Sequence, residues 1–149
     1  MDQEIEEWLK SAAISTGLRI ERLPTNRASE IENRARQRFV RGNPRAWWMS
    51  LSGACEHFNA KERKLEDILP AGTAKCWLIA ETGSTSGLPG YSLDACNVSA
   101  VLEECPYFEY YIVAEDFSWL VAESDHNVLF VCRPGASEQV IQSGPNAAG

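Results

Sequence analysis

The sequence predicts a single α+β domain, in which an antiparallel β-meander of four to five strands packs against two to four helices. The first observation is that residues 105–133 hold three short segments of aromatic and β-branched residues, separated by two polar connections. Such segments fit the pleated, half-buried surface of a strand. The second observation is that residues 2–16, 26–40 and 92–104 repeat apolar side chains at the spacing of one helix face.

The composition is that of an ordinary globular protein, with 149 residues of which 44% are hydrophobic and 23% are charged. This length suits one domain, which we place at residues 1–142, with residues 143–149 as a flexible tail. No run reaches the roughly 18 apolar residues that a membrane span needs. The N-terminal segment is acidic, whereas a secretory signal begins with basic residues. We therefore expect a cytoplasmic protein with no membrane contact.

The cysteines are odd in number, and most lie within apolar segments: Cys55, Cys76, Cys96, Cys105 and Cys132. In the cytoplasm we expect them to be reduced thiols that pack as small hydrophobic side chains. The chain has no Cys-x-x-Cys pair, and its two histidines are not spaced like zinc ligands. We therefore expect neither a metal site nor a cofactor.

The net charge of −7 is spread unevenly along the chain. Residues 1–45 hold nine Lys and Arg against seven Asp and Glu, whereas residues 46–149 hold five against fourteen. An acidic C-terminal portion argues against nucleic acid as the main partner. It is compatible with a basic protein partner, because opposite potentials steer encounter. The alternative is that the acidity only keeps the protein soluble.

The N-terminal part of the chain is predicted to form two helices and an edge strand. The helix over residues 2–16 buries Ile5, Trp8, Leu9 and Ala12, and Gly17 ends it. Residues 18–23 alternate apolar and charged, which predicts a short edge strand that ends at Pro24. The helix over residues 26–40 carries a narrow arginine ridge on one side, formed by Arg27, Arg34, Arg38 and Arg41. The ridge has three interpretations: a solvated surface, a phosphate or nucleic-acid contact, or a protein interface.

The middle of the chain holds a tryptophan pair and a glycine-rich loop. Of Trp47 and Trp48, we expect one to enter the core; an exposed one, with Trp48 as the candidate, would be a binding anchor. Residues 52–59 read as an irregular connection, residues 61–69 as a short helix and residues 75–81 as an interior strand. Residues 82–91 form a Gly-, Ser- and Thr-rich loop without a Walker motif, either a surface loop or the rim of a cleft.

The face of each meander residue follows from the two-residue period of a strand. In the strand over residues 107–113, Tyr107, Glu109, Tyr111 and Val113 share one face. In the next strand, Trp119, Val121 and Glu123 share one face. We expect Glu109 and Glu123 to lie together on the face of Tyr107 and Trp119, where they serve the structure or face a ligand.

Catalytic arrangements are few in this sequence. Cys105 and His126 could meet at one end of the meander, and Glu109 with Glu123 could form a carboxylate pair. The nucleophile-elbow, dinucleotide-binding and zinc-protease motifs are absent from the sequence. His126 lies in a Ser-Asp-His-Asn segment that is typical of a turn. The sequence therefore favours a protein that is not an enzyme.

Residues 104–113, Trp119 to Glu123 and the Asp125-His126 pair resemble a family of small bacterial proteins of unknown function. The resemblance extends to Trp47-Trp48 and to the Trp77-Leu78-Ile79 strand, and thus covers the chain from the tryptophan pair onward. The family is similar to the immunity-protein-like domains found beside bacterial toxins. This chain has Ser124-Asp125 where the family tends to have Asn-His, so no role for paired histidines and no catalytic residue carries over.

The leading prediction is a non-catalytic binding protein of the immunity or antitoxin kind, which caps a basic protein partner through an acidic surface. The alternative is a small-ligand-binding protein or minor enzyme, with a cleft lined by Glu109, Tyr111, Trp119 and the loop over residues 82–91. A third possibility is a homo-oligomer that buries the second face of the sheet. The predicted binding residues are Trp48, Glu109, Tyr111, Trp119, Glu123, Asp125 and His126.

Overall fold

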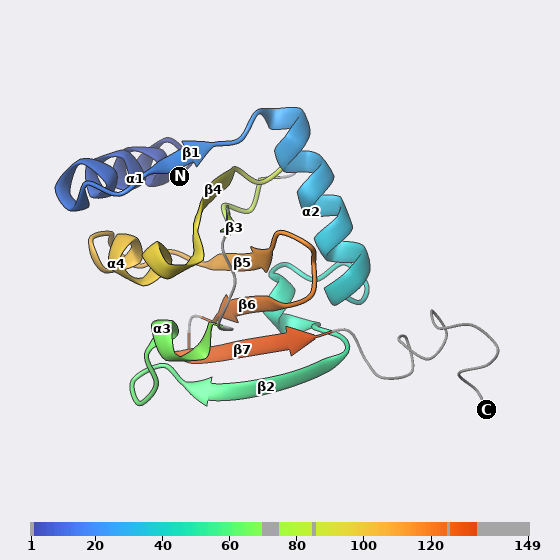
Figure 1. The fold of residues 1–149 in the computed structure, drawn as a ribbon. Coiled ribbons are helices and arrows are strands. Elements are labelled where there is room, and N and C mark those ends of the chain that lie inside the picture. The colour runs from blue at the N-terminus through green and yellow to red at the C-terminus, as the bar shows by residue number, and fades with distance from the viewer. Residues whose placement is uncertain (1, 70–74, 85, 125, 134–149) are drawn as a thin grey trace, which may run out of the picture.

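A computed structural model describes residues 2–69, 75–84, 86–124 and 126–133, and these form a seven-stranded antiparallel sheet covered by helices on both faces (Figure 1). The strand order is β1-β4-β3-β5-β6-β7-β2. The α+β class is confirmed, and the sheet has more strands than the four to five that we predicted. The predicted tail over residues 143–149 lies outside the described residues.

The helices and strands have the following bounds. The helices are α1 (Asp2–Thr16), α2 (Thr25–Phe39), α3 (Leu65–Ile68) and α4 (Val98–Glu103), with short 3-10 helices η1 (Trp47–Met49) and η2 (Ala95–Asn97). The strands are β1 (Ile20–Arg22), β2 (Ala54–Asn59), β3 (Lys75–Ala80), β4 (Gly90–Asp94), β5 (Tyr110–Ala114), β6 (Leu120–Glu123) and β7 (Val128–Arg133).

The two strands that the sequence did not predict are β2 and β4. Strand β2 is an edge strand that pairs along its whole length with β7, from Ala54 opposite Arg133 to Asn59 opposite Val128. Its polar sequence has no clear alternation, so only its long-range partner defines it as a strand. Strand β4 lies between β1 and β3. It takes up the first residues of the segment that we predicted as a helix, and only Val98–Glu103 is α-helical.

The helices divide into two layers. Helices α1, α3 and α4 lie on one side of the sheet and α2 on the other (Figure 1). Alternate side chains of β5 enter the two cores: Tyr110 and Ile112 pack with α1, α3 and α4, whereas Tyr111 and Val113 pack with α2 and η1. The second face of the sheet is therefore covered by this chain itself, and not by a second copy as the homo-oligomer hypothesis required.

The register between β5 and β6 shows that the prediction of Glu109 and Glu123 on one face is wrong. Tyr110 lies opposite Glu123, and Tyr111 lies opposite Ala122. Directly opposed residues share a face, so Glu123 lies with Tyr110 on the side of α1, α3 and α4. Glu109 and Tyr111 lie on the other face, on the side of α2. The turn between the strands sets this register, and Phe117 within it has a positive φ of 61°. Because strand faces alternate, a one-residue difference in register exchanges the two faces.

A disulfide joins Cys55 of β2 to Cys132 of β7. These two residues lie directly opposite each other across the strand pair. The prediction of reduced thiols is therefore wrong for this pair. The other three cysteines, Cys76, Cys96 and Cys105, are free thiols in the structure.

Candidate functional site

Tyr111 and Trp119, two of the predicted binding residues, are core residues. Tyr111 is 0% exposed and packs in the α2 layer, whereas Trp119 is 4% exposed and packs in the α1 layer. The sheet itself separates them. The predicted ligand cleft of Glu109, Tyr111, Trp119 and the loop over residues 82–91 is therefore not assembled.

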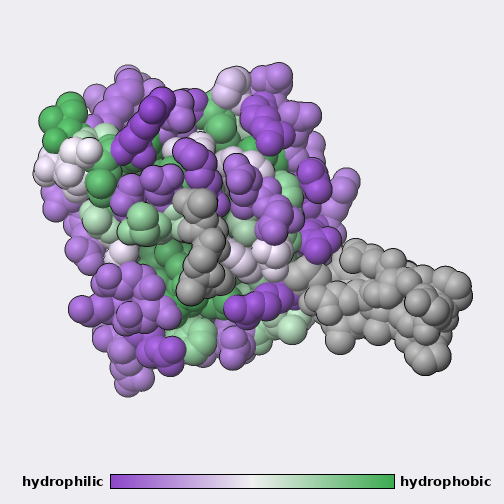
Figure 2. All heavy atoms as spheres, in the orientation of Figure 1, coloured by the Kyte–Doolittle hydropathy of each residue, from purple (hydrophilic) through white to green (hydrophobic). Residues whose placement is uncertain are grey.

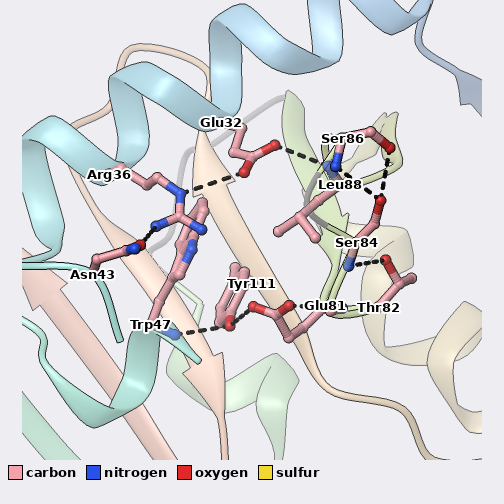
Figure 3. Close-up of polar contacts among 11 residues, drawn as sticks. Glu32, Arg36, Asn43, Trp47, Glu81, Thr82, Ser84, Ser86, Leu88 and Tyr111 are labelled. Atoms are coloured by element: carbon pink, nitrogen blue, oxygen red, sulfur yellow. Dashed lines mark hydrogen bonds and ion pairs between the residues drawn. The ribbon is translucent and has the colours of Figure 1, made fainter. Parts of the chain in front are cut away.

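Tyr111 acts as a buried link between the sheet and η1 (Figure 3). Its hydroxyl accepts the backbone N–H of Trp47 at 2.9 Å and donates to the carboxylate of Glu81 at 2.5 Å. Its ring stacks on that of Trp47 with a centroid distance of 4.2 Å and an interplanar angle of 3°. Burial, together with the hydrogen bond to Glu81, raises the pKa of Tyr111 well above its ordinary value.

The loop over residues 82–91 is attached to α2 through a buried carboxylate. Glu32, only 9% exposed, accepts the backbone N–H of Leu88 at 2.9 Å and the Nε–H of Arg36 at 3.3 Å. Figure 3 shows this carboxylate reaching from the helix to the loop. At the start of the loop, hydroxyl groups accept backbone N–H groups of neighbouring residues, as Thr82 does from Ser84. The described residues of the loop, 82–84 and 86–91, therefore help to close the core between α2 and the sheet.

The stability of the fold at alkaline pH tests whether the side chains of Cys76, Tyr110 and Tyr111 are buried. Burial raises the pKa of Tyr110, with a further contribution from Glu123, and it raises the pKa of Cys76 from 9.0 to about 12. Each pKa is higher in the folded chain, so these groups stabilise the fold at lower pH and lose that contribution as pH rises. We expect the unfolding free energy to fall from about pH 9 upward, by about 1.4 kcal/mol per pH unit for each titrating group.

Urea unfolding between pH 8 and 11 measures this dependence. The Tyr111→Phe variant is the matched comparison, because it lacks one buried phenol. Its unfolding free energy should fall less steeply above pH 10 than that of the parent. Equal slopes for the two proteins would show that the Tyr111 hydroxyl titrates alike in the folded and unfolded chains.

Three of the predicted binding residues do come together, around the carboxylate of Glu109. Trp48 donates its indole Nε1–H to Glu109 at 2.8 Å, and Arg45 donates two guanidinium N–H groups to it at 3.3 Å each. The imidazole of His126 lies edge-on to the Trp48 ring at 6.0 Å. The sequence analysis missed Arg45, whose only local signal is its place beside the tryptophan pair. The carboxylate already binds two donors, so it holds Trp48 in place.

Glu123 belongs to a separate cavity of about 400 Å³ on the side of α3 and α4. Its carboxylate accepts the hydroxyl of Tyr110 at 2.6 Å. The chain before β5 supplies Tyr107, which is 54% exposed, and the turn before α3 supplies Arg63 and Lys64. In Figure 2, hydrophobic atoms are visible in the hollow between α4 and α3. Arg63 and Lys64 could not be placed in this region from the sequence, because only the pairing of β2 with β7 brings them there.

The two catalytic arrangements considered from the sequence are absent from the described residues. Cys105 lines the cavity near α4 and donates its thiol to the carbonyl of Val101 at 3.5 Å, whereas His126 lies against Trp48 in the other layer. Burial and the neighbouring Glu104 raise the pKa of Cys105, which lowers its thiolate fraction. Glu109 and Glu123 lie on opposite faces of the sheet. Asp125 lies outside the described residues.

Three of the four arginines in the ridge contact Trp77 of β3 or Phe117 of the β5–β6 turn. Arg27 lies over the ring of Trp77 at 5.4 Å, and Arg34 lies over the ring of Phe117 at 4.4 Å. Arg38 donates its Nε–H to the backbone carbonyl of Phe117 at 2.6 Å. These contacts give the ridge a structural role, because they hold the β5–β6 turn in place.

The helices on the two sides of the sheet carry opposite net charge. Helix α2 holds four arginines against two glutamates. On the other side, exposed acidic side chains on or next to α1, α3 and α4 form a surface that we call the acidic face, namely Glu4, Glu7, Glu66, Asp67, Glu103 and Glu104. Exposed cations on the same helices or next to them are Lys10 on α1 and three residues before α3: Lys61, Arg63 and Lys64.

Within residues 2–69, 75–84, 86–124 and 126–133, no group of three or more His, Cys, Asp and Glu side chains is arranged to hold a metal ion. None of the helices in these ranges is long and apolar enough to cross a membrane.

Residues 1–143 match a family of unknown function, DUF6756. No curated protein and no solved structure shows significant similarity to the chain.

Proposed function

We propose that this chain, which belongs to the DUF6756 family, is a non-catalytic binding protein whose acidic face docks on a basic protein partner. The separation of charge between the two helical layers carries this proposal. A cluster of like charges on one side of a small protein attracts a partner of opposite charge and raises the association rate. Acidity that served only solubility would not need to gather on one layer.

Exposed apolar side chains lie within or beside the acidic face. Tyr107 is 54% exposed next to the cavity near α4, and Ile14 is 85% exposed on α1. Tyrosine is among the residues that most often dominate the binding energy of an interface, when polar groups surround it. The combination of an aromatic anchor with acidic surroundings suits a partner that presents basic residues around an apolar centre.

An immunity-like role in the cytoplasm is the form of this function that we favour. A protein that neutralises a toxin needs to bind and cover its target, and it needs no catalytic group of its own. Basic targets such as nucleases fit an acidic surface, because their nucleic-acid sites are positively charged. Residues 104–113 and Trp119 to Glu123 resemble a bacterial family that is itself similar to immunity-protein-like domains, and this resemblance supports the same assignment.

Charge reversal on the acidic face tests the proposal. In the Glu7→Lys, Glu66→Lys, Glu103→Lys variant, we expect loss of a basic protein that the parent chain captures from cytosol of its source and that mass spectrometry identifies. The physical reason is electrostatic, so moderate salt should release the protein from the parent as well.

A second variant provides the matched control. Glu21→Lys, Glu30→Lys, Glu115→Lys changes the net charge by the same amount, but its substitutions lie on β1, on α2 and in the β5–β6 turn. This variant should keep the partner, with a dissociation constant close to that of the parent. Equal capture by both variants, or capture that salt does not weaken, would contradict the proposal.

A further inference from the structure

We propose that the cavity between α3 and α4 is an anchor pocket for a cationic side chain, arginine or lysine, of the protein partner. This inference rests on the proposed function, and it adds where on the acidic face the partner is held. The pocket has a floor, walls and a rim of different chemistry, and each contributes to the assignment.

The floor of the pocket is a carboxylate with one oxygen available. Glu123 is half-buried at the end of β6, and its Oε1 accepts the hydroxyl of Tyr110 at 2.6 Å. Its second oxygen has no hydrogen bond or ion pair with any residue in the described ranges. A carboxylate that is removed from bulk water binds a cationic donor more strongly than an exposed one does.

The walls are aromatic and apolar. Tyr107, Phe108 and Tyr110 line the cavity together with Leu102 and Leu129. Aromatic ring faces attract a cation, and apolar walls accommodate the methylene stem of a long basic side chain. The volume of about 400 Å³ lies at the small end of the range for ligand pockets, which suits one side chain better than a larger ligand.

The rim carries both signs of charge. Arg63 and Lys64 lie at the mouth with Glu103, and all three are exposed to water. The guanidinium of Arg63 already lies over the ring of Phe58 at 4.5 Å. Exposed charges are screened by water and salt, so the half-buried Glu123 has the larger influence on what enters. The rim cations repel an incoming cation only weakly, because both are exposed to water and salt.

Model side chains test the pocket without the partner. Titrations of the full chain with Nα-acetyl-arginine amide and Nα-acetyl-lysine amide, followed by NMR, should show saturable shifts of residues around Glu123. In Glu123→Gln, which retains an acceptor for Tyr110, the affinity should fall tenfold or more, because a neutral acceptor replaces a charged one. Tyr107→Ala should weaken binding as well, and the exposed position of Tyr107 makes that variant a second readout if Glu123→Gln does not fold. Glu21→Gln, at the far edge of the sheet, should bind as the parent does.

Three results would overturn this assignment. The first is the absence of saturable shifts with either cationic amide. The second is equal affinity in the parent and in Glu123→Gln. The third is binding of Nα-acetyl-glutamate amide that Lys64→Ala abolishes, which would identify an anion site at the rim.

Capture experiments separate the pocket from the proposed function. If charge reversal on the acidic face abolishes capture while Glu123→Gln and Tyr107→Ala retain it at parental affinity, the anchor pocket is wrong and the docking face stands. If charge reversal also leaves capture unchanged, both are wrong.

Discussion

Trp47→Ala should lower the unfolding free energy by about 3–5 kcal/mol, the range for truncating a buried large aromatic side chain. Trp47 is 0% exposed, stacks on Tyr111 and lies beneath the guanidinium of Arg36 at 5.4 Å. Its removal leaves a cavity between α2 and the sheet. For a chain of this size each kcal/mol corresponds to roughly 2–4 °C in melting temperature, so calorimetry should detect the change readily.

The adjacent Trp48→Ala variant is the control for this experiment. Trp48 is only partly buried, and its main polar contact is the hydrogen bond to Glu109. We expect a smaller loss of about 1.5–3 kcal/mol, the usual contribution of a hydrogen bond to a charged group. Equal losses in the two variants would show that Trp47 is not the residue that fills the core.

Loss of the Cys55–Cys132 disulfide is the second large effect that we expect. The two cysteines are 77 residues apart in sequence, and the chain-entropy model gives about 4.5 kcal/mol for a crosslink of this span. Cys55→Ser, Cys132→Ser should therefore unfold at lower denaturant concentration than the oxidised parent. Cys96→Ser, which replaces an exposed free thiol, is the matched control and should unfold as the parent does.

Thiol counting tests the bond itself. After denaturation without reductant, three cysteines of the parent should react with a maleimide, and all five should react after reduction. Reaction of five thiols without reductant would show that the bond does not form under the conditions of purification. In that case the double serine variant should be nearly as stable as the parent.

The fold class and most elements could be predicted from the sequence, because they follow from local patterns. The helix over residues 2–16 has a clear apolar stripe, and β3 is apolar throughout, as an interior strand should be. Strand β2 could not be predicted, because its polar residues acquire a strand conformation only beside β7. The pairing of Cys55 with Cys132 depends on the same long-range contact.

The site was predicted less well, because side-chain faces depend on register. Glu109 and Glu123 were expected on one face, and the geometry of the β5–β6 turn decides otherwise. The sequence predicts that one tryptophan of the pair enters the core, but it does not indicate that this residue is Trp47. Glu32 was missed, although a signal was present: it follows Ala28 by four residues and precedes Ala35 by three, on the buried side of α2.

The place of β2 at the edge of the sheet has a consequence for synthesis of the chain on the ribosome. Among the strands of the described residues, its only neighbour is β7, which is also the last of these strands to be translated. Residues 54–59 therefore leave the ribosome first and remain without this partner strand until residues 128–133 have emerged. Contacts so distant in sequence slow folding, and an unpaired strand that waits is exposed to wrong pairing with other chains. Ribosome-bound chains that stop before β7 should accordingly be more sensitive to proteases near β2 than released full-length chains.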